Sequence, residues 1–329
     1  MNTTAIQQAL FKQVKERLPA HLSLPDELAS LLGISADSAY RRIRGEKTMD
    51  LGELALVCST YHLSLDALVA QSSGQFIFNG RFVGSSEYPF ATWLAGMNAQ
   101  LEQLAADRQA VVIFRAEDIP TFHYFQFPEL TQFKLFFWRR TILDDPQFQQ
   151  KRFSLADREP ELLAMARKTY LTYSRLPCTE IWNADSLNAF LRQIVFYRDA
   201  GLFVKEEEVQ VLFDKMLELV AHLQAETEAG VKFNVGEPAS SGTAAFTIYV
   251  NEVMQGDNMI YASSGGMRMV FVNHSAVNYI ATSDAAFCDY TQRSMEMITK
   301  RSVLISGTGE KERNRFFRSM REEVERRRR

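Results

Sequence analysis

Apolar residues recur every three or four positions through the first seventy residues, which is the period of a helix with one buried face. Ile6, Leu10 and Val14 lie on one face of a helix that we expect over residues 5–17. The same spacing predicts further short helices at 25–32, 36–44, 50–61 and 64–70. This part of the chain is therefore expected to form an all-helical unit.

Turn and capping residues separate the second of these helices from the third. Gly33 follows the second helix, and glycine most readily takes the left-handed conformation that ends a helix. Ser35 is placed to cap the third helix, which Gly45 ends. Ala29 is small enough for two helices to cross closely. A helix, a glycine turn and a second helix at this spacing are typical of a helix-turn-helix unit.

Polar and basic side chains gather on the third helix of this unit. We expect the following residues on or near its outer face: Ser35, Ser38, Tyr40, Arg41, Arg42, Arg44 and Lys47. Such cations can neutralise DNA phosphates, and an arginine can reach the O6 and N7 atoms of guanine. The alternative is a solvated basic helix without a role in nucleic-acid binding.

Two stretches of this region carry a family resemblance, LASLLGISADSAYRRIRGEK and then LGELALVCSTYHLSLDALV. Residues 1–70 resemble the Cro/repressor-type (Xre-like) helix-turn-helix domains of bacterial regulators. The resemblance implies that Ser35 to Arg44 form a recognition helix in the major groove. One departure is that Arg42 stands where the family usually has an apolar residue late in this helix, with Ile43 beside it.

The remainder of the chain is expected to form one larger domain. We assign residues 1–72 to the helix-turn-helix domain, 73–88 to a linker and 89–329 to an α+β sensing or oligomerisation domain. Its helical part should cover about 120–230 and its sheet-containing part about 231–329. Helices are predicted at 89–106, 206–225, 284–299 and 309–326, and 129–227 is expected to be mainly helical.

Alternating apolar and polar residues predict the strands of this domain. They are expected at 111–114, 246–250, 258–262, 267–273, 277–281 and 302–306, with turns at 255–258 and 263–266. The short connections favour an antiparallel meander. The fold class is therefore α+β, with an all-helical amino-terminal domain before a larger, mainly helical domain that holds a small, largely antiparallel sheet.

Further features of the larger domain leave its role open. FPELTQFKLFFW and LISGTGEKERNRFF resemble the carboxy-terminal regions of uncharacterised bacterial helix-turn-helix regulators. The aromatic stretch from His123 to Trp138 either lines an apolar ligand pocket or forms a core helix. The heptad-like seams at 90–104 and 209–223 serve either a dimer interface or the core.

Composition and charge limit the classes of function. The chain has 329 residues, is 46% hydrophobic and carries a net charge of −3, so disorder is excluded. Because the basic residues cluster locally, a DNA-binding role does not depend on the total charge. No apolar run is long enough to span a membrane, and three widely spaced cysteines suit a reducing cytoplasm. We expect a cytoplasmic protein.

The sequence lacks the common catalytic and metal-binding motifs. The five histidines and three cysteines show no metal-ligand spacing, and no nucleophile elbow is present. The segment SGTGEK lacks the spacing of a phosphate loop, yet Gly307, Gly309, Lys311 and Arg313 form a candidate anion site at a helix start. We expect no metal, no cofactor and no enzymatic activity.

Together these features predict a sequence-specific DNA-binding transcriptional regulator. Its partners should be double-stranded DNA, a second copy of the chain in a homodimer, and an unknown small-molecule effector of the carboxy-terminal domain. Two alternatives stay open: a protein-interaction module that does not bind DNA, and an enzyme domain tethered to a DNA reader.

Overall fold

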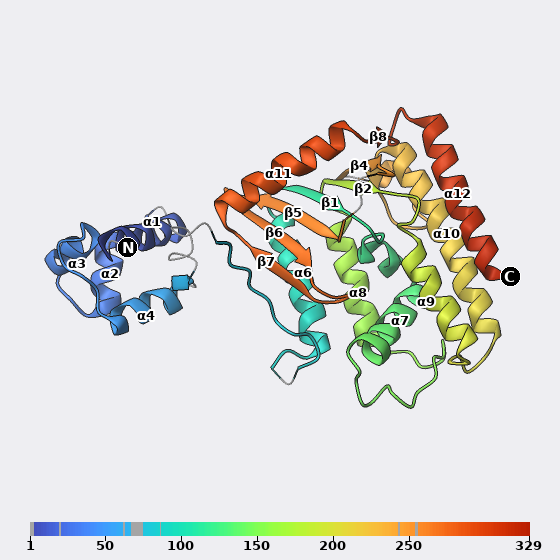
Figure 1. The fold of residues 1–329 in the computed structure, drawn as a ribbon, viewed down its shortest axis with the longest axis horizontal. Coiled ribbons are helices and arrows are strands. Elements are labelled where there is room, and N and C mark those ends of the chain that lie inside the picture. Colours follow the sequence, from blue (N-terminus) through green and yellow to red (C-terminus); the bar gives the residue numbers. More distant parts are fainter. Residues whose placement is uncertain are drawn as a thin grey trace. The chain divides into compact units, whose positions relative to one another are not determined.

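The computed structural model describes residues 3–19, 21–61, 63–66, 75–85, 87–242, 244–253 and 256–329. The chain divides into two compact units, Met1–Ile77 and Phe78–Arg329. Among the described residues no helix is long and apolar enough to cross a membrane. Figure 1 shows the elements of each unit.

The regular elements described in the amino-terminal unit are all helices: α1 (Thr3–Arg17), α2 (Leu24–Leu32), α3 (Ala36–Ile43) and α4 (Leu51–Thr60). Their bounds follow the predicted ones closely. The helix predicted at 64–70 lies largely outside the described residues. One apolar cluster holds the unit together, and its fully buried members are Leu10, Phe11, Val14, Leu28, Ala39, Val57 and Leu63.

The second unit is built on a mixed sheet of eight strands (Figure 1). The strands are β1 (Val111–Arg115), β2 (Cys178–Trp182), β3 (Val231–Lys232), β4 (Ala244–Val250), β5 (Met259–Ser264), β6 (Met267–Asn273), β7 (Tyr279–Thr282) and β8 (Val303–Leu304). Their order is β3-β4-β2-β1-β5-β6-β7, and β8 also pairs with β4. β4, β2 and β1 run parallel, whereas β5, β6 and β7 form an antiparallel meander.

The sheet differs in part from the largely antiparallel sheet predicted from the sequence. The protein is α+β, as predicted, but its sheet has a parallel centre that includes β1 and β2, which precede residue 231. β2 lies inside the stretch expected to be helical. Glu180 stands at the middle of β2 and is fully buried there, so the strand lacks the simple apolar pattern that would have identified it. β4 pairs with β2, and β1 is inserted between β2 and β5.

Helices cover both faces of the sheet, and their bounds are α6 (Phe90–Ala105), α7 (Pro128–Phe137), α8 (Pro160–Tyr173), α9 (Asn188–Asp199), α10 (Glu207–Ala229), α11 (Ala285–Lys300) and α12 (Glu310–Arg328). Short 3-10 turns lie at Thr121–Gln126 and Ala239–Ser241, and a π-helical turn at Trp138–Ile142 follows α7. α11 packs on the face of β5 and β6 that carries Tyr261 and Val270. α6 packs on the opposite face, beside Ile260.

Both heptad-like seams, at 90–104 and 209–223, lie in the core of this unit. Phe90, Leu94 and Leu101 of α6 are buried in the main core, as are Leu212 and Leu219 of α10. α6 packs against α8, and α10 packs against α12. These seams therefore form core rather than a free dimerisation surface.

The segment predicted as a linker, 73–88, belongs in its later part to the second unit. Asn79 forms an isolated antiparallel bridge with Ala281 of β7, and Val83 is buried in the main core. The backbone bridge to β7 and the burial of Val83 attach this part of the segment to the second unit, so it is not an open tether. The boundary between the units lies at Ile77.

Candidate functional site

The turn between α2 and α3 sets the geometry of the basic surface. Gly33 ends α2 in the left-handed conformation, with φ 63°, as its residue type predicted. The amide of Ile34 then donates to the carbonyl of Ala29 at 3.0 Å. The hydroxyl of Ser35 caps α3 by accepting from the amide of Ser38 at 3.2 Å. The start and direction of α3 are therefore fixed by local hydrogen bonds.

One face of α3 is open to solvent. Tyr40 is 50% exposed, and the side chains of Arg41 and Arg44 are 51% and 60% exposed. Lys47, in the loop after α3, is also exposed. Arg44 lies four residues after Tyr40 and three after Arg41, so it shares a face of the helix with both. Ser38, the remaining predicted residue, is half-buried beside this face.

Arg42 corrects the predicted outer face, because it points into the unit and is 4% exposed. Its guanidinium binds both carboxylate oxygens of Glu53 on α4, at 3.0 and 2.5 Å, and donates to the carbonyl of Ser38. Ala39 lies three residues earlier on the same buried face. Arg42 therefore occupies the place of an apolar core residue and joins α3 to α4, so it is not free to contact DNA.

Two acidic residues near the basic face were missed by the sequence reasoning. Glu46 pairs with Arg44 at 3.1 Å and lies 4.0 Å from the guanidinium of Arg41. Asp37 is exposed in the first turn of α3, one helical turn from Arg41. Glu46 lowers the positive charge that the two arginines present. The sequence Arg44–Gly45–Glu46 could have indicated this pairing, because it places a carboxylate just after the end of the helix.

A buried amide from α1 holds the loop that follows α3. Gln7 donates to the carbonyls of Arg42 and Lys47, and it accepts from the amide of Met49 at 2.9 Å. Gly45 has a φ of 80°, and a Cβ there would lie 2.4 Å from the methyl group of Thr4. α1 and this glycine thereby fix where Lys47 leaves the helix. A glutamine on the apolar face of α1 gave no sequence signal for this role.

A capped helix, a left-handed glycine and an exposed cationic face are the parts of a helix-turn-helix reader. Residues 6–80 match the BetR domain. This is a helix-turn-helix type of DNA-binding domain, so the chain carries a DNA-binding module at its amino-terminal end. No curated protein and no solved structure matches the chain.

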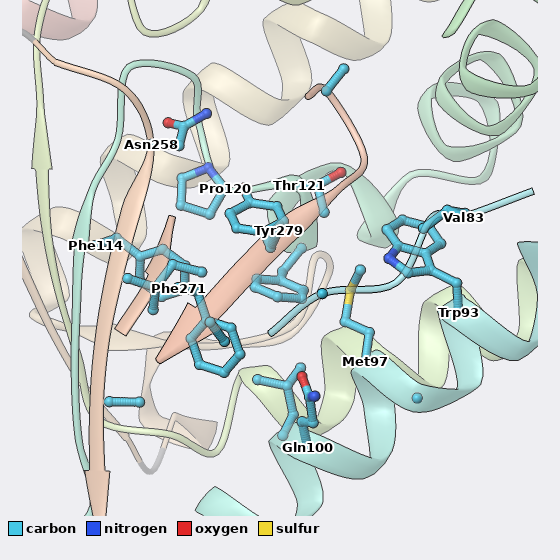
Figure 2. Close-up of a pocket in the computed structure, with 18 of the residues that line it drawn as sticks. Val83, Trp93, Met97, Gln100, Phe114, Pro120, Thr121, Asn258, Phe271 and Tyr279 are labelled. Carbon is cyan, nitrogen blue, oxygen red and sulfur yellow. The ribbon is translucent and has the colours of Figure 1, made fainter. Parts of the chain in front are cut away.

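The second unit contains a cavity of about 670 Å³ (Figure 2). It lies between α6 and the sheet face formed by β1, β5, β6 and β7, and it also borders residues 79–83 and 115–122. Its volume is within the range of small-molecule sites. From the aromatic stretch 123–138 only Lys134 and Trp138 line it, and most of that stretch is core.

A buried polar cluster lies beside β2 but does not open on this cavity. Glu180 accepts hydrogen bonds from the hydroxyl of Tyr173 and from Nε1 of Trp182, and it lies 3.1 Å from Nε2 of His123. Burial by itself raises the pKa of Glu180, but His123 and the Tyr173 hydroxyl hold that pKa below its ordinary value. His123, Tyr173 and Glu180 are all 0% exposed, so a substrate has no access to them in this conformation.

The candidate anion site at the start of α12 also needs correction. The amide of Gly307 donates to the carbonyl of Thr227, and the guanidinium of the buried Arg313 donates to the carbonyls of Ile305 and Gly307. A Cβ on Gly309 would lie 2.4 Å from the carbonyl oxygen of Leu304. These groups therefore build a tight turn, and Lys311 is the one cationic side chain of the four that is exposed. Within the described residues, no cluster of three potential metal ligands is present.

Proposed function

We propose that this protein is a sequence-specific, homodimeric transcriptional regulator of Cro/repressor type whose second unit senses a small molecule. The observation that carries the proposal is the exposed cationic face of α3, held by the Gly33 turn and the Ser35 cap. In this proposal the second unit is a sensor and has no catalytic step.

Each exposed residue of α3 has a part in DNA reading. Arg41 and Arg44 have the reach and the donor geometry to bind a guanine edge or a phosphate, and Lys47 adds a phosphate contact. Tyr40 adds a hydroxyl and an aromatic ring on the same face. Arg42, on the buried side of α3, fixes the helix against α4 through its ion pair with Glu53. Base contacts from Arg41 or Arg44 would supply the sequence preference.

Dimerisation follows from how little DNA one such helix covers. Helix-turn-helix regulators reach useful specificity by reading two half-sites about one helical turn apart. The two seams of α6 and α10 are buried in the core, so the proposed dimer uses another surface. Light scattering on the full chain, alone and with DNA, measures whether two copies bind one site.

Fluorescence polarisation against DNA from upstream of the protein's own coding region tests the proposal. The full chain should bind one site selectively, and an Arg41→Ala/Arg44→Ala variant should lose this selectivity. Its salt slope should fall by about 0.9 for each of the two arginines that contacts a phosphate. Arg108→Ala, at an exposed arginine of the second unit, is the matched control and should bind as the parent does. Equal affinity for all sequences at low salt would refute the proposal.

A further inference from the structure

We infer that the cavity of the second unit binds a flat, largely apolar molecule that carries one carboxylate, and that the bound molecule acts on the BetR domain through residues 78–83. This inference rests on the proposed regulatory function. It concerns only the second unit and the segment by which the chain enters it.

The walls of the cavity select an apolar, ring-bearing ligand. Phe114 of β1, Ile260 of β5 and Phe271 of β6 are cross-strand neighbours, so they form one continuous apolar surface on the sheet. Trp93 and Met97 of α6 form part of the opposite wall (Figure 2). Aromatic and thioether side chains contact a ring by stacking and by edge contacts. A cavity of about 670 Å³ with such walls accommodates a drug-sized molecule.

Hydrogen-bond donors gather at one end of the cavity. Asn258, Thr121 and Tyr279 lie together there, away from Gln100 (Figure 2). Oδ1 of Asn258 already accepts from the amides of Glu117 and Asp118, at 2.8 and 3.2 Å. The amide nitrogen of Asn258 is therefore left to donate, and the hydroxyl of Tyr279 can donate beside it. These donors fit an acceptor group on the ligand.

The charged residues that line the cavity favour an anion. The carboxylate of Asp118 lies 3.8 Å from the ammonium of Lys134, so these two charges offset each other. Burial raises the pKa of Asp118 and lowers the pKa of Lys134, so the pair as a whole adds little net charge to the cavity. Arg81 also lines the cavity, where it packs over the ring of Tyr88, and no ion pair to Arg81 occurs among the described residues. A carboxylate is the group that a guanidinium and neutral donors bind best.

The same segment that presents Arg81 connects the cavity to the BetR domain. The amides of Asn79 and Ala281 donate to each other's carbonyls at 2.7 and 2.8 Å, and the amide of Val83 donates to Oδ1 of Asn278 at 2.9 Å. Asn79, Arg81 and Val83 all line the cavity, and the amino-terminal unit ends at Ile77. A ligand that contacts these residues stabilises their pairing with β7, and it thereby shifts the conformations open to the DNA reader.

A series of three probes of equal shape tests the ligand class on the full chain. Naphthylacetate, naphthylacetamide and naphthylethylamine are titrated by calorimetry and by quenching of tryptophan fluorescence. The acid should bind at least tenfold more tightly than the amide, and the amine should bind most weakly. Arg81→Gln should reduce the affinity for the acid to that for the amide, whereas Arg301→Gln, at an exposed arginine of the same unit, should not.

A cavity-filling variant separates cavity binding from surface binding. Ala262 is buried and lines the cavity, so Ala262→Phe should abolish binding of the acid while the circular dichroism spectrum is unchanged. Equal binding of the three probes, binding of none of them, or full binding by Ala262→Phe or Arg81→Gln would each overturn the ligand class.

Hydrogen exchange and DNA titration test the coupling. Naphthylacetate should slow exchange in a peptide over residues 79–83 and change DNA affinity by at least fivefold. Asn278→Ala, which removes the acceptor of Val83, should bind the probe but lose most of the DNA effect, whereas Asn278→Asp keeps the acceptor and the effect. Probe binding without either response overturns the coupling. A chain that binds the probe but no DNA refutes the proposed function alone.

Discussion

Substitution of Arg42 tests whether this arginine of α3 stabilises the fold rather than contacts DNA. Arg42→Met fills the same volume with apolar atoms but leaves the carboxylate of Glu53 without its partner. The Arg42 and Glu53 side chains are 5% and 18% exposed. Breaking a buried ion pair from one side costs about 3–5 kcal/mol, and the residual exposure of Glu53 reduces the expected loss to roughly 2–3 kcal/mol.

Hydrogen-exchange protection of α3 and α4 in the full chain measures this loss. Since 1.4 kcal/mol is a factor of ten, exchange should become about 30- to 150-fold faster. The three tryptophans, Trp93, Trp138 and Trp182, all lie in the second unit, so their fluorescence should not change. At temperatures where the BetR domain stays folded, the salt slope of DNA binding should match that of the parent protein.

Two further variants make the Arg42 argument refutable. Glu53→Gln keeps a side-chain oxygen that can accept from the backbone amide of Asp50 in the capping box, so Arg42→Met/Glu53→Gln should recover most of the lost protection. Arg44→Met should show the reverse pattern, with normal exchange and a salt slope lower by about 0.9. A lower salt slope in Arg42→Met, or exchange within threefold of the parent, would show that Arg42 serves DNA and not the fold.

Two other expectations follow from single carboxylates. Glu46→Gln frees Arg41 and Arg44 from their shared partner, so DNA affinity at low salt should rise several-fold. The control Glu87→Gln, in the second unit, should leave DNA affinity unchanged. An unchanged affinity in Glu46→Gln would contradict the role of Glu46. Glu180 has a lowered pKa, so its contribution to stability is present above the unfolded pKa near 4.3 and is lost as pH falls through the folded value. Urea unfolding followed by tryptophan fluorescence should therefore show a loss of about 2–4 kcal/mol for Glu180→Gln at pH 7 that shrinks in acid, and a loss independent of pH would contradict this reasoning.

The amino-terminal helices could be predicted because local signals agree there. The left-handed Gly33, the Ser35 cap and the three-to-four spacing of apolar residues each act over a few residues. The inward position of Arg42 could not be derived in this way. Arg42 points inward because it pairs with Glu53, and the sequence does not show that α4 packs on α3 to bring these two residues together.

The second unit was harder to predict because its centre is non-local. β1 and β2 pair in parallel across more than sixty residues, and Cys178 to Trp182 carry a buried carboxylate in place of an apolar residue. The antiparallel meander from β5 to β7 was recovered, since its turns are short and its strands alternate. The cavity takes walls from α6, four strands and the segment before α6, so no stretch of sequence contains it.

The pairing of Asn79 with Ala281 also protects the molecule from aggregation through the edge of its sheet. β7 is the last strand on its side of the sheet, and an uncovered edge strand invites pairing with another chain. Residues 78–83 cover this edge and place the charged Arg81 along it. A fragment that begins at residue 89 would therefore expose β7 and aggregate, whereas a fragment that begins at Phe78 would keep the edge closed. The few residues that join the two units thus also keep the second one from polymerising.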